Sequence, residues 1–393
     1  MHVGIRRHVV RLCTFLFLLI GLARPVFAQT KPAAAPSPPE EPTKLLDRLK
    51  EPDQGGGLHL TKHFAIVFGG IKSGSGIAAG PALSWKFADG SYTQIKAVYS
   101  VKKFKLVQAR YDSRKFWDDR ASVVTRVRWQ DAPKLNVFRL GPDAPDESVH
   151  WGEEKSEASM RIRLQLPGAM RIGAGFSMET YDTTGGRIDL VDAPGLPPVP
   201  PLPGLGTNPW YAHAFFSAAH DSRTSPEYSR RGHLFEASIH TYNDVHDEQD
   251  PFGRFEAIAQ QLIPTGDKGV LDLSAQTWIS LSDGDRSVPF FLMPSLGGSS
   301  YLRAYPSYRF RDRHALFLRG EYRWPIHKMI DLAGLVEGGK VAPEVKGLKL
   351  SNMAESFCGG IRVHKDASSI VDLDVCHGRD GIKFTIGFNS GGS

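Results

Sequence analysis

The residues of this sequence that could do chemistry do not combine into a catalytic or metal-binding motif. No G-x-S-x-G occurs, so the serine nucleophile elbow of lipase-type and patatin-type hydrolases is missing. Residues 69–76 resemble a phosphate-binding loop, but they lack its G-K-[S/T] ending and lead into a predicted strand, so we interpret them as a flexible entry to the first strand. Four histidines on neighbouring predicted strands show no ligand spacing: His213, His220, His233 and His240. We therefore expect no enzyme activity, no cofactor and no metal.

Short runs of alternating apolar and polar residues fill the chain from about residue 74 to Phe388. In residues 160–166 the apolar Met160, Ile162 and Leu164 alternate with Arg161, Arg163 and Gln165, which is the period-two pattern of a β-strand. A soluble sandwich would show the same alternation with its polar face outward, so the pattern alone leaves two fold classes open.

The lengths of the connections favour one of these classes. The pattern predicts sixteen strands, at residues 74–87, 91–101, 104–112, 121–130, 134–140, 157–166, 169–181, 209–219, 232–242, 253–262, 269–282, 313–324, 328–337, 353–364, 369–376 and 381–388. Long connections at 141–156, 182–208 and 283–312 alternate with tight ones such as 102–103, 131–133 and 167–168. Short turns at one end and long loops at the other are typical of outer-membrane barrels. We predict an all-β, 16-stranded antiparallel transmembrane β-barrel, with an apolar face toward lipid and many arginines toward a wet lumen.

The first 28 residues have the features of an export signal. A basic segment with Arg6, Arg7 and Arg11 precedes the apolar run 12–22, and Val26-Phe27-Ala28 offers a cleavage site. The alternative is an uncleaved anchor helix, although the apolar run is short for a bilayer. The chain has 48 Lys and Arg against 42 Asp and Glu, and four of the bases lie in this segment, which contains no acid. The near-neutral remainder argues against nucleic-acid binding.

Residues 29–56 are rich in Pro and Gly and are predicted to be a disordered periplasmic tether. Beyond the signal, Cys358 and Cys376 are the remaining cysteines of the exported chain. A turn near residues 366–368 would place them opposite each other on adjacent strands, facing the lumen, where a disulfide is possible in an oxidising compartment. A register slip of one residue would turn the two thiols to opposite faces, so both outcomes remain open.

The last predicted strand carries a more specific pattern. In residues 379–388 a polar start and Gly381 are followed by apolar residues at alternate positions, Phe384, Ile386 and Phe388. This resembles the carboxy-terminal signal by which bacterial outer-membrane barrels are recognised for assembly. The tail 389–393 departs from that pattern, in which the aromatic residue is last, and an ordinary amphipathic strand is the alternative reading.

Three segments between residues 296 and 325 are more specific still: Leu-Gly-Gly-Ser-Ser-Tyr-Leu-Arg-Ala-Tyr at 296–305, Tyr-Arg-Phe-Arg-Asp at 308–312 and Leu-Arg-Gly-Glu-Tyr-Arg-Trp-Pro at 318–325. Together they resemble the bacterial surface-antigen superfamily, the BamA/TamA-type barrels. The family motif (V/L)RG(F/Y) is matched at 302–305 with Ala304 for Gly, and F-x-D-x-G at 335–339 with Leu335 for Phe and Glu337 for Asp. The likeness covers roughly residues 57–388, which we take as the barrel domain.

The resemblance implies that the loop carrying 302–305 folds into the lumen and is locked there by Arg303 on Glu337. The positions that match the two motifs are Leu302, Arg303, Tyr305, Glu337 and Gly339. Arg can hold a carboxylate with a planar fork of donors, which would offset the entropy of ordering the loop. We expect Ala304 to lose backbone freedom that Gly would give, and Arg303→Ala to destabilise the barrel far more than Arg309→Ala. The alternative is that Arg303 and Glu337 are separate solvated charges.

The resemblance also frames the expected function. Transport machines of the family carry periplasmic polypeptide-transport-associated (POTRA) domains, for which residues 29–56 are too few, so we expect a barrel-only member in the bacterial outer membrane. One hypothesis is a barrel that inserts or transports proteins or lipids, with outer-membrane lipids and unfolded outer-membrane proteins, or a periplasmic partner, as partners. The other is a passive pore or structural barrel. One fold can serve many functions, so the resemblance alone does not decide between these two hypotheses.

Overall fold

The computed structural model describes residues 57–183, 202–226, 228–246, 249–266, 268–282, 287–365 and 368–388. The predicted signal peptide (1–28), tether (29–56) and tail (389–393) lie outside these residues. Within the described ranges, no helix is long and apolar enough to cross a membrane.

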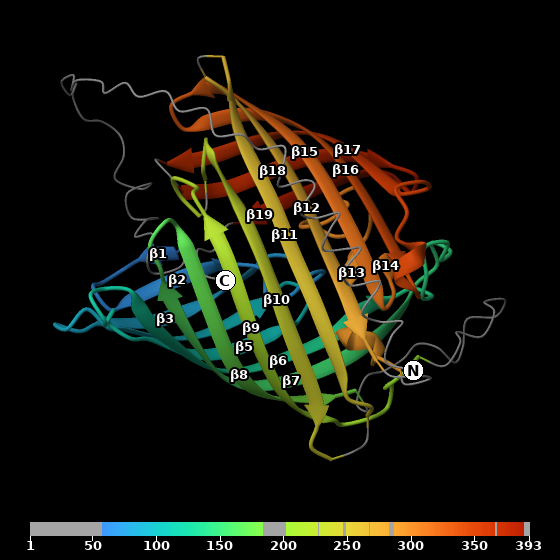
Figure 1. Cartoon of the computed structure of the whole chain (residues 1–393), viewed down its shortest axis with the longest axis horizontal. Coiled ribbons are helices and arrows are strands. Elements are labelled where there is room, and N and C mark those ends of the chain that lie inside the picture. Colours follow the sequence, from blue (N-terminus) through green and yellow to red (C-terminus); the bar gives the residue numbers. More distant parts are fainter. Residues whose placement is uncertain are drawn as a thin grey trace. The chain divides into compact units, whose positions relative to one another are not determined.

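Sixteen antiparallel strands in the described part of the chain form a nearly closed barrel (Figure 1). Each strand pairs with its neighbour in sequence, and the last strand adjoins the first. The wall strands are β2 (Phe64–Gly69), β3 (Ala78–Lys86), β4 (Tyr92–Ser100), β5 (Lys105–Asp112), β6 (Ala121–Val137), β7 (Val149–Gln165), β8 (Met170–Asp182), β9 (Trp210–Asp221), β10 (Gly232–Asp244), β11 (Phe252–Thr265), β12 (Gly269–Leu281), β15 (His314–His327), β16 (Ile330–Ala342), β17 (Ala354–Lys365), β18 (Ser368–Gly378) and β19 (Gly381–Phe388). This confirms the predicted all-β antiparallel barrel and its number of strands.

Alternation along each strand separates an apolar outer face from a polar inner face. On β16, Val336 is 54% exposed while its neighbour Glu337 is fully buried. On β19, Ile382, Phe384 and Ile386 are all exposed. Neighbouring strands pair their backbone groups with each other around the nearly closed ring, as a strand structure in hydrocarbon requires. The exposed apolar face is therefore the outer wall, and the polar face surrounds the lumen.

Two of the predicted strand assignments are wrong and cancel each other in the count. Strand β2 was not predicted, because residues 64–69 are mostly apolar without alternation and precede a glycine-rich segment. Residues 121–137, predicted as two strands with a turn at 131–133, form the single strand β6. Its ladder with β7 is irregular between Ala132 and Leu135, because Pro133 supplies no N–H donor, and then resumes.

These corrections also change the interpretation of residues 69–76 and the end of the barrel at which residues 102–103 lie. Residues 69–76 are not an entry to the first strand, because they lie at the end of β2 and in its connection to β3, and Lys72 forms an ion pair with Glu153 on β7. Residues 102–103 connect β4 to β5, at the same end as the long connections 183–209 and 282–313. We call this end the loop end. The other end, where β2 begins and β19 ends, is the terminal end.

The remaining elements are short. Strand β1 (Gly57–His59) pairs with β2, and β13 (Ser295–Leu296) pairs with β14 (Phe310–Arg311). Two single-turn 3-10 helices, η1 (Phe290–Leu292) and η2 (Val345–Gly347), lie in loop-end connections.

Candidate functional site

Residues 287–313, which we call the plug loop, contact two separate parts of the inner wall. The first part of the loop packs against aromatic residues near the loop end of β7 to β11. Phe290 is buried, with its ring centroid 4.6 Å from that of Trp151 on β7. The second part packs against β15 to β18, where Leu296, Leu302 and Tyr305 are at most 1% exposed. The loop therefore bridges strands on different sides of the ring; that it blocks passage through the lumen remains a prediction.

Arg303 and Glu337 lie together, but not in the predicted geometry. The main-chain N–H of Arg303 donates to Glu337 Oε2 at 2.7 Å. The guanidinium Nε lies 3.8 Å from Glu337 Oε1 and donates instead to the Ser299 carbonyl at 3.1 Å. Neither Glu337 Oε1 nor Arg303 Nη1 has a hydrogen-bond partner among the described residues. A main-chain bond and a looser charge contact replace the bidentate fork.

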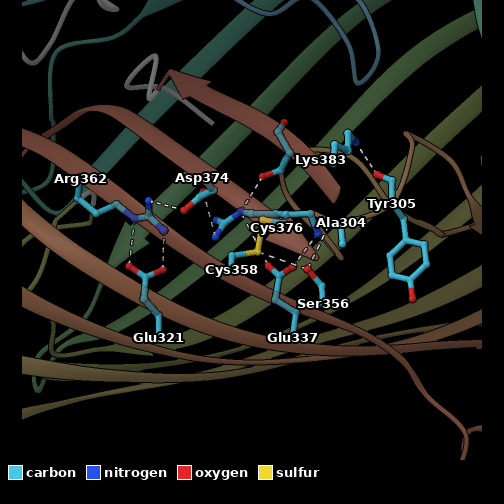
Figure 2. Close-up of a disulfide and its surroundings, with 12 residues drawn as sticks. Ala304, Tyr305, Glu321, Glu337, Ser356, Cys358, Arg362, Asp374, Cys376 and Lys383 are labelled. Carbon is cyan, nitrogen blue, oxygen red and sulfur yellow. Dashed lines mark hydrogen bonds and ion pairs between the residues drawn. A yellow bond between two sulfur atoms is a disulfide. The ribbon is translucent and has the colours of Figure 1, made fainter. Parts of the chain in front are cut away.

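A buried network of charges continues from this contact along the wall. Arg303 Nη1 lies 3.7 Å from Asp374 Oδ2 on β18. Asp374 accepts a 2.8 Å hydrogen bond from Arg362 Nη1 on β17, and Arg362 Nε donates to Glu321 Oε1 on β15 at 3.2 Å (Figure 2). With Glu337 on β16, opposite charges thus link the loop to the four consecutive strands β15 to β18. Buried charges are tolerated when they are paired in this way.

A disulfide joins Cys358 and Cys376 directly beneath the loop tip (Figure 2). The two residues face each other in the β17–β18 ladder, and both are buried. Ser356, on the same strand, accepts a 3.1 Å hydrogen bond from the Ala304 N–H. The disulfide therefore belongs to the wall on which the loop tip rests.

Ala304, which replaces the glycine of the family motif at the loop tip, does not have the expected effect on the backbone. Ala304 does not adopt a positive φ; Leu302 does, at 48°, so the backbone strain falls on the residue two positions earlier. Gly339 faces this Leu302: a Cβ built on Gly339 would lie 2.8 Å from Cδ1 of both Leu296 and Leu302. Glycine is needed at 339 for close approach of the loop rather than for its own backbone angles.

Arg309 is buried, although its loss is expected from the sequence to destabilise the barrel far less than the loss of Arg303. Its side chain is 2% exposed, Nε lies 2.6 Å from Asp380 Oδ2, and Nη1 donates to the Ala144 carbonyl at 2.8 Å. The guanidinium also lies over the rings of Phe138 and Phe310. Arg309 therefore holds the loop at least as firmly as Arg303, and a comparison with it does not isolate the role of Arg303.

The predicted assembly-signal residues lie on or beside the last strand. Phe384 is 76% exposed on the outer face, as is Ile386 at 51%, and Gly381 opens β19 with φ of +108°. Phe388 ends the strand. Lys383, on the inner face, donates to the Tyr305 carbonyl and so joins β19 to the plug loop.

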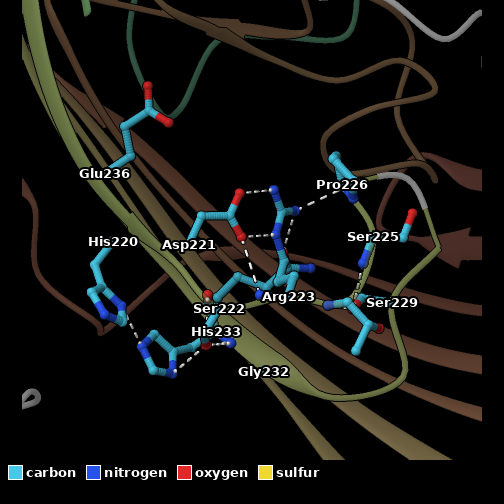
Figure 3. A network of polar contacts seen from close by, with 12 residues as sticks. His220, Asp221, Ser222, Arg223, Ser225, Pro226, Ser229, Gly232, His233 and Glu236 are labelled. Carbon is cyan, nitrogen blue, oxygen red and sulfur yellow. Dashed lines mark hydrogen bonds and ion pairs between the residues drawn. The ribbon is translucent and has the colours of Figure 1, made fainter. Parts of the chain in front are cut away.

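A second loop, which the sequence did not reveal, connects β9 to β10 at the terminal end and contacts β16 and β17. Its base is held by Arg223, whose Nε and Nη2 each donate to Asp221 at 2.9 Å (Figure 3). Farther along, the Tyr228 hydroxyl donates to Asp331 Oδ2 on β16 at 2.6 Å, and the Tyr228 ring stacks on His364 of β17. Burial, together with the Asp331 bond, raises the pKa of the Tyr228 hydroxyl. We call residues 222–231 the latch loop.

A cavity of roughly 1670 Å³ lies beside the plug loop. Its lining includes residues 69–77, from the last residue of β2 onward, residues 298–301 of the plug loop and residues 383–387 of β19. It therefore touches both strands that meet at the seam of the ring. Polar lining groups include Arg303, Arg319 and Glu321.

The histidines form pairs rather than metal sites. His213 Nε2 lies 3.0 Å from His240 Nδ1, and His220 Nδ1 lies 2.8 Å from His233 Nε2. Among the residues that the structure describes, no group of three or more His, Cys, Asp or Glu side chains is placed to hold a metal ion.

Comparisons with known proteins identify the fold. No family model matches the sequence, and no curated protein matches it. Among solved structures, BamA from Haemophilus ducreyi lacking POTRA domains 1–3 aligns with a TM-score of 0.59 and 12% identity, over 83% of this chain and 70% of that one. The fold of this chain is that of the BamA barrel.

Two further structures give the same result. CdiB from Escherichia coli aligns with a TM-score of 0.54 and 12% identity, covering 84% of this chain and 62% of its own. CdiB from Acinetobacter baumannii aligns with a TM-score of 0.52 and 8% identity, covering 82% and 58%. This chain thus spans about three fifths of each CdiB chain. At such low identity the likeness concerns the fold alone.

Proposed function

We propose that this protein is an outer-membrane barrel that inserts or transports proteins or lipids and has no enzymatic activity. The observation that carries the proposal is the plug loop, which is anchored on β15 to β18 through Arg303, Glu337 and Ser356 beside a large cavity. A wide constitutive pore has no need of such a loop. A barrel whose loop and seam line a cavity has a place for a client segment or a lipid.

A structural barrel is the second candidate, and a specific observation favours it. The plug loop and the latch loop both make buried contacts with the inner wall, from opposite ends. If both loops remain in place and block the lumen, the protein contributes only a rigid wall. Fold-level likeness does not separate the two candidates.

Reconstitution separates them. The chain without residues 1–28 is folded into liposomes, folding is checked by heat-modifiable gel mobility, and insertion of an unfolded client barrel is timed against empty liposomes. We expect faster insertion with the wild type and loss of the acceleration in Arg303→Ala. The control is Lys346→Ala, which removes a cation from an exposed ion pair with Glu344 at the loop end. No acceleration by a folded wild-type barrel would favour the structural candidate.

A further inference from the structure

A continuous basic surface covers the inner face of β4 to β8. Its members alternate with outward apolar residues: Val127, between two arginines, is 56% exposed, and Ile162 is 43% exposed. The basic residues on this face are Lys96, Arg110, Arg126, Arg128, Arg161, Arg163 and Arg171. The plug loop contacts β15 to β18 and the loop-end residues of β7 to β11, such as Trp151, which lies ten positions before Arg161 on β7.

Only part of this charge is compensated by acids. Three of the arginines form ion pairs, Arg110 with Asp112 at 2.8 Å, Arg128 with Glu157 at 2.7 Å and Arg171 with Glu236 at 2.9 Å. Three other bases, Lys96, Arg126 and Arg161, make no ion pair with any described residue. Arg161 lies instead over the Phe215 ring, 4.9 Å from its centroid.

The strand register brings like charges together. Arg110 on β5 is directly opposite Arg126 on β6. Arg126 is in turn opposite Ser159 on β7, so Arg161, two residues farther along, is its diagonal neighbour. Like charges directly opposite each other destabilise a sheet, and diagonal neighbours are within reach of long side chains.

Hydrogen-bond donors on the same surface lack acceptors. The Nε atoms of Arg126 and Arg128 are buried and have no hydrogen-bond partner among the described residues. A buried donor without a partner costs free energy, and more when the group is charged. Repulsion and an unsatisfied donor therefore coincide at Arg126, and an anion beside the guanidinium groups would relieve the repulsion.

We propose that the inner face of β4 to β7 binds a small soluble polyvalent oxyanion, a molecule with two or more phosphate or carboxylate groups. The guanidinium fork matches the oxygens of both groups. Several cations on consecutive strands, about 5 Å apart, suit several anionic groups rather than one. The surface faces the lumen and not the apolar outer wall, which favours a soluble molecule over a lipid. The inner face of β16 to β18 is richer in acids, including Asp331, Glu337 and Asp374, so an anion is drawn to β4 to β7.

Isothermal titration of the barrel, folded in a zwitterionic detergent, with tripolyphosphate and separately with citrate tests the proposal. We expect binding at low ionic strength that weakens as salt is added. The double variant Arg126→Gln/Arg161→Gln should bind at least tenfold more weakly. The preferred probe distinguishes a phosphate ligand from a carboxylate ligand.

A second readout keeps the test independent of a binding signal. Arg126→Gln removes the repulsion with Arg110, so the unliganded variant should melt at a higher temperature than the wild type, and tripolyphosphate should stabilise it less. Arg120→Gln is the matched control, because Arg120 is an exposed arginine in the 113–120 turn outside this surface. Binding of neither anion, or the same loss of binding in Arg120→Gln as in the double variant, would overturn the proposal.

Discussion

The main-chain N–H of Arg303 is a better partner for Glu337 than its guanidinium is: the N–H is 2.7 Å from Oε2, whereas Nε is 3.8 Å from Oε1. The carboxylate therefore fixes the position of the loop backbone directly. The arginine side chain reaches past it toward Ser299 and Asp374. This geometry changes which substitutions should matter.

Glu337→Ala is expected to lower the free energy of unfolding by about 3 kcal/mol or more. The substitution leaves the buried Arg303 N–H without an acceptor and removes one partner of the buried Arg303 charge. Glu337→Gln keeps an acceptor for that N–H and should cost much less, about 1 kcal/mol. Urea unfolding of the barrel in lipid vesicles measures both. Equal losses in the two variants would show that the charge, rather than the main-chain bond, holds the loop.

Arg309→Ala should destabilise the barrel at least as much as Arg303→Ala, which reverses the order expected from the sequence. Removal of Arg309 leaves Asp380 without its 2.6 Å ion-pair contact and breaks the bond to Ala144, and the loss of a buried partner costs about 3–5 kcal/mol. The temperature at which half of the barrel loses its folded gel mobility ranks the variants. Lys346→Ala is the control that should not change this temperature. A midpoint for Arg309→Ala close to that of the wild type contradicts the prediction.

Gly339→Val should displace Leu302 and loosen the plug loop, because even a Cβ at this position meets two buried leucines at 2.8 Å. Overpacking of this kind costs about 1–3 kcal/mol. Gly334→Val on the same strand is the matched control, since a Cβ there has no atom within 4 Å. The measurement is protease cleavage of the plug loop in the folded barrel. The same cleavage rate in both variants would rule out the close-approach role of Gly339.

Tyr228→Phe should release the latch loop while the wall stays folded. The change removes a 2.6 Å hydrogen bond to a carboxylate that is fully buried, a loss of about 1.5–3 kcal/mol. We expect more frequent openings in single-channel recordings than for the wild type. Tyr92→Phe is a control, because it removes a tyrosine hydroxyl bound to Ser84 and Gln94, away from the latch. Recordings that do not differ between Tyr228→Phe and the wild type would show that the latch does not control the lumen.

Much of the wall could be predicted from the sequence, because the two faces of a strand in a barrel meet different solvents. The sequence already places Val127 on the outer face and its two neighbours, Arg126 and Arg128, on the inner face. The prediction failed where this signal is weak: β2 is apolar on both faces, and the proline in β6 resembles a turn although the partner strand β7 continues past it. A long strand with a bulge and two short strands are alike in sequence, and only the partner distinguishes them.

The sequence by itself determined the alternation, the long connection after β12 and the two motifs that suggested Arg303 and Glu337 as partners. Only the tertiary structure decided that the Arg303 N–H makes the short bond, that Leu302 rather than Ala304 has the positive φ, and that Arg309 is buried. It also decided that Tyr228 reaches Asp331, about a hundred positions away, and that Arg110 faces Arg126. The reason is physical: alternation is local along the chain, whereas burial, register and hydrogen-bond geometry depend on which distant segments the closed ring brings together.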